Sequence, residues 1–271
     1  MRSFEQLQHW PVANAAAAVV TPQGVSATGD TGRVFRLASV TKPLVAYAAL
    51  VAVEEGAVEL DQPAGPAGST VRHLLAHTSG VAFATPEVIA KPGARRIYSS
   101  AGFELLADFL TAHTGIEFPV YLREAVFEPL GMGGAVLDGS AGHACHASVD
   151  DLVRFAAELL EPRLVSRQTL DEATSVQFPG RDGILPGFGS QRPNDWGLGF
   201  EIRDGKTPHW TGSANSARTY GHFGQSGTFL WVDPEIQVAT IALTDENFGD
   251  WARAAWPEFS DSVIAETHNT L

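Results

Sequence analysis

An apolar run over residues 44–53 follows Pro43 directly. A segment that is apolar on every face predicts a helix buried in the core of a protein. Proline is tolerated near a helix start, because the first backbone N–H groups have no intrahelical partner there. We therefore expect a helix from about Ser39 to Glu55, with Gly56 just beyond its C-terminal end.

Strand patterns lie toward both ends of the chain. Residues 13–20 and 24–27 flank a Thr-Pro-Gln-Gly turn and predict a β-hairpin, and residues 34–37 predict a short third strand. Further antiparallel strands are expected in the C-terminal third, over residues 197–202, 229–232 and 238–243. A closing helix is expected over residues 250–268.

The middle of the chain follows a helical period instead. A turn-rich segment, residues 60–66, marks the change. Helices are expected over residues 70–76, 103–114, 118–127, 149–160 and 168–175. The glycine- and proline-rich residues 180–194 are expected to form a mobile or wall-forming loop before the strand pattern resumes.

Composition narrows the class of protein. The 271 residues, 44% hydrophobic and 18% charged, describe a globular protein with a large core. A net charge of −13 argues against nucleic-acid partners and against binding to an anionic membrane surface. A single cysteine, Cys145, excludes an internal disulfide.

The N-terminal segment is expected to carry no export signal. Residues 1–10 are polar with one acidic residue, and the apolar stretch that follows is short and runs into a turn. No apolar run reaches the length of about 18 residues that a transmembrane helix needs. A cytoplasmic protein is therefore expected.

The strongest candidate chemistry lies at the start of the helix over residues 39–55. Ser39 and Lys42 are three residues apart and therefore lie on one helix face. A serine hydroxyl needs an adjacent base to act as a nucleophile, and a partly desolvated lysine can supply it. The alternative is that Ser39 merely caps the helix.

Two groups of histidines could be considered as metal ligands, but their spacing does not favour a metal site. His73 and His77 share a helix face but lack a third ligand at a supporting spacing. His143, Cys145 and His146 fall within four positions and have no second cluster, which is not zinc spacing. Packing roles are preferred, and no metal or cofactor is expected.

Ser39-x-x-Lys42, Tyr98-Ser99-Ser100 before a helix, and His222-Phe223-Gly224 at the start of a strand occur in this order. The arrangement resembles the serine β-lactamase and penicillin-binding protein family, in the branch of class C β-lactamases, DD-peptidases and related esterases. The resemblance extends over residues 33–245, with supporting stretches at 74–80, 128–132, 197–200 and 227–234.

The resemblance implies an α/β (α+β) β-lactamase-like fold: an antiparallel sheet flanked by helices, with an inserted all-helical region. The sheet domain would be discontinuous, comprising residues 1–58 and 190–271, and the helical domain would comprise residues 59–189. The cleft would lie where they join.

The resemblance also implies residue roles. Ser39 would be the acyl-accepting nucleophile, Lys42 its activating partner, and Tyr98 the phenol that exchanges protons with the leaving group and water. The backbone N–H groups of Ser39 and Gln225 would form the oxyanion hole. Gly224 would keep the strand edge open, and His222 would orient substrate or tune Tyr98.

Two departures from the family pattern favour esters over antibiotics or cell-wall peptides. Ser100 stands where most β-lactamases and peptidases of the family carry asparagine, so a substrate amide would be held less well. His222 replaces the lysine of class C enzymes, and neutral histidine favours a substrate carboxylate less.

The favoured hypothesis is thus an esterase that acts on small esters through an acyl-Ser39 intermediate. A β-lactamase or DD-carboxypeptidase-like enzyme with the same site is one alternative, and a catalytically silent binding protein is another. The expected partner is a small ester or amide substrate. The oligomeric state does not follow from the sequence.

Overall fold

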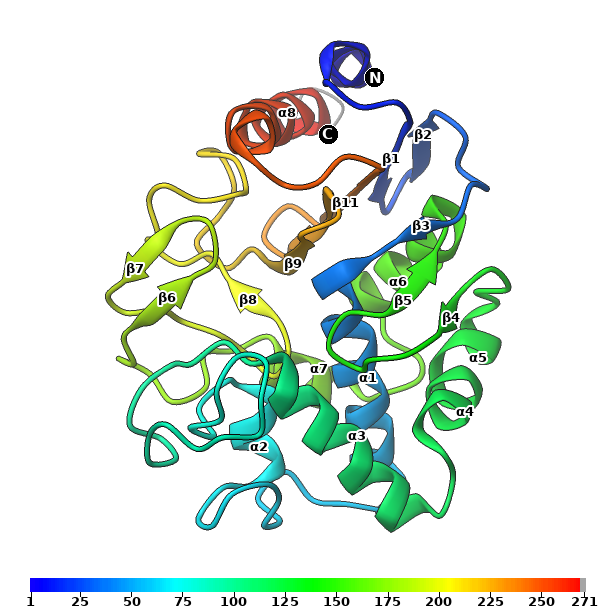
Figure 1. The fold of residues 1–271 in the computed structure, drawn as a ribbon. Coiled ribbons are helices and arrows are strands. Elements are labelled where there is room, and N and C mark those ends of the chain that lie inside the picture. The colour runs from blue at the N-terminus through cyan, green and yellow to red at the C-terminus, as the bar shows by residue number, and fades with distance from the viewer. Residues whose placement is uncertain (269–271) are drawn as a thin grey trace.

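The computed structural model describes residues 1–268. At its centre is a six-stranded antiparallel sheet of order β2-β1-β11-β10-β9-β8, which joins strands from both ends of the chain (Figure 1). These strands are β1 (Ala15–Thr21), β2 (Gly24–Thr28), β8 (Glu201–Ile202), β9 (Tyr220–Gly224), β10 (Thr228–Asp233) and β11 (Val238–Thr244). Because β1 pairs with β11, the two ends of the chain close one sheet.

Alternate residues of β1 serve two separate cores, as the two-residue period of a strand requires. Ala17 and Val19 pack in an aromatic-rich cluster with α8 (Asp250–His268) and the 3₁₀ helix η1 (Arg2–His9). Ala16 and Val20 face the opposite way, into the larger core that contains α1 (Thr41–Glu54) and α6 (Val149–Leu160). The sheet is therefore covered on both faces (Figure 1).

Helix α1 is the centre of the larger core. Every residue from Thr41 to Ala52 is buried, which explains why its sequence shows no polar face. The other helices are α2 (Val71–Leu75), α3 (Ser100–Thr114), α4 (Phe118–Leu122), the π-helix η3 (Arg123–Phe127), α5 (Glu128–Leu130) and α7 (Arg167–Ala173). Two small sheets complete the fold: β3 (Phe35–Arg36) with β5 (Cys145–Ala147) and β4 (Val136–Leu137), and β6 (Gly183–Leu185) with β7 (Gly189–Gln191).

The predicted N-terminal hairpin is present as β1 and β2. Helix α6 also has the predicted bounds, because Ser148 and Asp151 form a complete capping box at its start. Strand β3 pairs with β5 outside the main sheet. The division into a sheet domain and an inserted helical domain stays a prediction, and α6, from the middle of the chain, packs on β1 and β11.

Three local predictions are wrong. Residues 180–194 contain the β6–β7 hairpin and are not simply a loop. The strand expected over residues 197–202 is reduced to the two residues of β8. His222 is the middle residue of β9 and not its first, because pairing with β10 extends this strand back to Tyr220.

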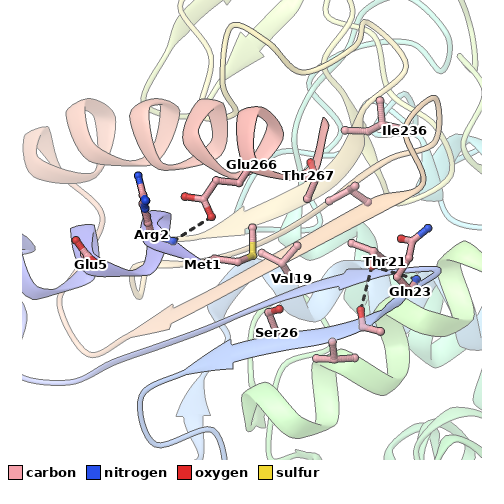
Figure 2. A pocket seen from close by; sticks show the side chains of 13 residues that line it. Met1, Arg2, Glu5, Val19, Thr21, Gln23, Ser26, Ile236, Glu266 and Thr267 are labelled. Carbon is pink, nitrogen blue, oxygen red and sulfur yellow. Dashed lines mark hydrogen bonds between the residues drawn. The ribbon is translucent and has the colours of Figure 1, made fainter. Parts of the chain in front are cut away.

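A pocket of about 830 Å³ opens on the side of the sheet where the chain begins (Figure 2). It lies between η1, the β1–β2 hairpin and the end of α8, where the backbone N–H groups of Arg2 and Ser3 donate to the Glu266 carboxylate. None of the predicted site residues lines it. Among residues 1–268, no helix has the length and apolarity required to cross a membrane.

Candidate active site

Ser39 lies on a single 3₁₀ turn, η2 (Ala38–Val40), that leads directly into α1. Ala38 has a φ of +46°, an uncommon left-handed conformation for a residue with a side chain. The Ser39 side chain makes no capping hydrogen bond, so the structure does not support the alternative of a helix cap. The residue is half-buried and lines a cavity of about 320 Å³.

Lys42, one turn later, is completely buried. Its Nζ lies 2.8 Å from Tyr98 Oη, 3.1 Å from Ser100 Oγ, 2.8 Å from the Gly142 carbonyl oxygen and 3.5 Å from Ser39 Oγ. Burial lowers the pKa of Lys42 to about 7, although Glu104 opposes the shift. The amine is thus available in its neutral, basic form near neutral pH.

Tyr98 connects these two groups. Its hydroxyl donates to Ser39 Oγ at 2.6 Å and accepts from Lys42 Nζ, which also lies 4.5 Å from the centre of the ring. Burial raises the pKa of Tyr98 above its usual value, so the resting phenol is neutral. The structure therefore shows a continuous path from Lys42 through Tyr98 to Ser39.

Strand β9 and the turn after it bring three further site residues close to Ser39: His222, Gly224 and Gln225. A Cβ at Gly224 would lie 2.3 Å from the Leu37 carbonyl oxygen, so only glycine allows this strand to come so close to the turn that carries Ser39. Gln225 follows at once and lines the same cavity as Ser39. No described residue accepts a hydrogen bond from its backbone N–H.

The His222 ring is buried in the cavity wall, 5.8 Å from the Tyr98 ring. Its Nδ1–H donates to the Phe223 carbonyl oxygen at 2.7 Å, which leaves Nε2 as the unprotonated nitrogen of a neutral ring. Burial, and then the charge of Lys42, lower the pKa of His222 to about 3. This position therefore presents no cation to a substrate at neutral pH.

The sequence interpretation missed a buried polar cluster behind the cavity. Glu201 lines the cavity and accepts from Lys206 Nζ at 2.5 Å, and from His209 Nε2 and Trp210 Nε1. Burial alone would raise the pKa of Glu201, but His209 and Lys206 together lower it to about 2. The sequence carried no signal for this cluster, because an acidic residue between Phe200 and Ile202 fits the outward-facing position of an alternating strand.

Three of the residues first weighed as metal ligands, Cys145, His73 and His77, have other contacts. Cys145 is buried in β5, its backbone N–H donates to Thr41 Oγ1, and burial raises its thiol pKa to about 12. His73 Nδ1 lies 2.9 Å from Thr70 Oγ1 at the start of α2. His77 Nδ1 accepts from the backbone N–H of Ser99, beside Tyr98.

The fold and the site together define the class of β-lactamase-like proteins. The antiparallel sheet is built from both chain ends and has helices on both faces, and a serine, a lysine and a tyrosine meet beside a cavity. The chain belongs to the beta-lactamase family, whose sequence profile matches residues 8–263. This confirms the resemblance and the fold class predicted from the sequence.

Individual relatives support the same conclusion. A curated relative, esterase EstB from Burkholderia gladioli, is 33% identical over 247 residues, which are 81% of this chain and 60% of the length of that protein. The crystal structure of a beta-lactamase from Mycobacterium bovis is 60% identical with a TM-score of 0.97, and the alignment covers 98% of this chain and 99% of that one.

A penicillin-binding protein homologue from Pyrococcus abyssi shares the fold at 19% identity and a TM-score of 0.75, covering 98% of this chain and 76% of that one. Family membership and the similarity to an esterase support a serine hydrolase.

Proposed function

We propose that this chain is a serine acyl hydrolase that cleaves small neutral esters through a covalent acyl-Ser39 intermediate. The observation that carries the proposal is the hydrogen-bonded path from Lys42 through Tyr98 to Ser39, at the wall of a cavity. Similarity to esterase EstB supports the choice of esters.

In the acylation step, Ser39 Oγ attacks the ester carbonyl carbon. With Lys42 neutral, the Tyr98 hydroxyl turns its proton from Ser39 Oγ toward Lys42 Nζ and accepts from Ser39 instead. The serine proton then passes to the Tyr98 oxygen while the Tyr98 proton passes to Lys42, whose lowered pKa makes the neutral amine available. The C–O bond to the alcohol then breaks, and the alcohol leaves with a proton returned through Tyr98. Water repeats the sequence on the acyl-enzyme and releases the acid.

The oxyanion would be stabilised by the backbone N–H groups of Ser39 and Gln225. The close approach that Gly224 permits, and the free N–H of Gln225 within the described residues, support this role. Oxyanion donors of this kind contribute on the order of 10²–10³ to the rate of acyl transfer.

The cavity wall favours neutral substrates. Its apolar lining comprises Phe83, Leu185, Pro186, Trp196 and Phe223. No lysine or arginine is among the lining residues, and the carboxylate of Glu201 in this wall is already paired with Lys206. Burying a substrate carboxylate without a cation is unfavourable, whereas a neutral ester has no such cost. A volume of about 320 Å³ suits a small molecule.

The second candidate is a β-lactamase, which the 60% identity to the Mycobacterium bovis beta-lactamase favours.

The two candidates are distinguished by offering purified protein p-nitrophenyl butyrate and a chromogenic cephalosporin. We expect turnover of the ester, its loss in Ser39→Ala, and full activity in Ser26→Ala, a matched change on exposed β2. Faster cephalosporin turnover would favour the second candidate.

Charge selectivity is tested with two aryl esters of similar size, phenyl acetate and 4-acetoxybenzoate. We expect kcat/KM for the neutral ester to exceed that for the carboxylate by at least about tenfold, since one unpaired charge costs more than the 1.4 kcal/mol of a tenfold ratio.

Labelling of the active-site serine tests whether the protein is an enzyme at all. A fluorescent phosphonate that labels neither wild type nor Lys42→Ala would indicate a silent binding protein.

A further inference from the structure

His77 follows α2 in a left-handed backbone conformation, with a φ of +57°, and its side chain is buried. The turn directs the residue toward the segment that carries Tyr98. Nothing in the proposed chemistry uses His77, and it lines no part of the cavity at Ser39.

His77 accepts two hydrogen bonds, which hold the chain on either side of Tyr98. The backbone N–H of Ile97 donates to the His77 carbonyl oxygen at 2.8 Å, and the backbone N–H of Ser99 donates to His77 Nδ1 at 3.1 Å. Ser99 in turn caps α3 by accepting from the Gly102 N–H. Backbone motion at Tyr98 is therefore restricted on both sides.

The ring of His77 also supports the phenol directly. Its centre lies 4.8 Å from the Tyr98 ring and 4.7 Å from the Trp196 ring, which itself packs 5.7 Å from Tyr98. The contact places one face of Tyr98 against aromatic side chains while its hydroxyl reaches Ser39 and Lys42.

Packing alone does not explain a histidine here. Because Nδ1 accepts the Ser99 N–H, the proton of the neutral ring is on Nε2, which is buried and has no hydrogen-bond partner among the described residues. An unpaired buried N–H is unfavourable, and an apolar ring of similar shape would avoid it. The acceptor at Nδ1 is the feature that such a ring would lose.

We propose that His77 is the positioning residue for Tyr98: through its carbonyl oxygen and Nδ1 it fixes the phenol within reach of Ser39 and Lys42. The inference rests on the proposed function. The Tyr98 hydroxyl must lie 2.6 Å from Ser39 Oγ and 2.8 Å from Lys42 Nζ at once, and a displacement near 1 Å can reduce a rate about 100-fold.

The test compares two substitutions that both tolerate the left-handed backbone. His77→Asn retains a side-chain oxygen close to the position of Nδ1, whereas His77→Gly removes the acceptor. His73→Asn is the matched control, because His73 lies one helical turn earlier and contacts none of the three catalytic candidates. Hydrolysis of p-nitrophenyl butyrate gives kcat and KM, and thermal unfolding checks the fold.

We expect kcat to fall about 100-fold in His77→Gly with KM within about threefold of wild type, and kcat within about fivefold of wild type in both His77→Asn and His73→Asn. Equal kcat in His77→Gly and wild type would overturn the assignment. So would a folded His77→Asn with kcat as low as that of His77→Gly. Should His77→Gly fail to fold, His77→Asn decides alone: a folded protein with less than a hundredth of wild-type kcat refutes the role.

Labelling of Ser39 by a fluorescent phosphonate separates this inference from the function on which it rests. A wild-type protein that is neither labelled nor active on esters overturns both. A labelled and active wild type with an unimpaired His77→Gly variant overturns only the role of His77.

Discussion

Burial of the Lys42 amine is expected to lower the free energy of unfolding of the protein. Its side chain is completely buried, and its pKa falls from 10.5 to about 7 on folding. The folded state therefore binds fewer protons than the unfolded chain between these two values. Lowering the pH from above 10.5 toward 7 consequently lowers the free energy of unfolding. Below pH 7 the stability lost through burial of Lys42 no longer changes with pH.

The size of the effect follows from the two pKa values. One pKa unit corresponds to about 1.4 kcal/mol, so the cost approaches roughly 5 kcal/mol at pH 6 and about 2 kcal/mol at pH 9. Lys42→Met removes the ionisable group and keeps most of the volume. The difference in unfolding free energy between this variant and wild type should thus shift by roughly 3 kcal/mol in favour of the variant from pH 9 to pH 6.

Urea unfolding of both proteins at the two pH values measures the shift. Lys91→Met is the matched control, since Lys91 is exposed and should change the unfolding free energy little at either pH. A difference between Lys42→Met and wild type that stays constant from pH 9 to pH 6 would refute the argument that burial holds the Lys42 pKa near 7.

Three other predictions concern the site and the buried ion pair behind it. Wild-type kcat/KM for a neutral ester should rise with pH through about 7 to a plateau, because the neutral amine of Lys42 is the active form; a profile flat between pH 5.5 and 8.5 would contradict this. Gly224→Ala should lower kcat about 100-fold or more, because the added Cβ would lie 2.3 Å from the Leu37 carbonyl oxygen; steady-state kinetics that leave kcat intact would exclude that contact. Glu201→Gln should destabilise the protein by about 3–5 kcal/mol in urea unfolding, because Lys206 loses its buried partner; a loss below 1 kcal/mol would show that the pair is not essential.

The sequence predicted those parts of the fold whose signals are local. The capping residues Ser148 and Asp151 define the start of α6, and a turn motif defines the β1–β2 hairpin. The spacing alone placed Ser39 and Lys42 together, whereas Tyr98 could be added only through the family resemblance, since no periodicity relates residue 98 to residue 39. The catalytic roles of these residues stay predictions.

What the sequence did not predict depends on contacts between distant segments. The length of β9 is set by its pairing with β10, and the β6–β7 hairpin forms within a segment whose glycine and proline content suggested a loop. The pairing of Glu201 with Lys206 and His209 requires a turn that brings residue 206 back over β8. His77 was considered as a metal ligand, because its contact with Ser99 cannot be inferred from spacing along α2.

The location of Lys42 on α1 has a consequence for how the protein would lose its activity. Residues 41–52 form the least accessible helix-length segment of the fold, and such segments open only when the whole domain unfolds. In a denaturant titration, the midpoint for inactivation should therefore coincide with the midpoint for loss of helical circular dichroism. The amide hydrogens of the middle of α1 should be among the slowest to exchange with solvent deuterium.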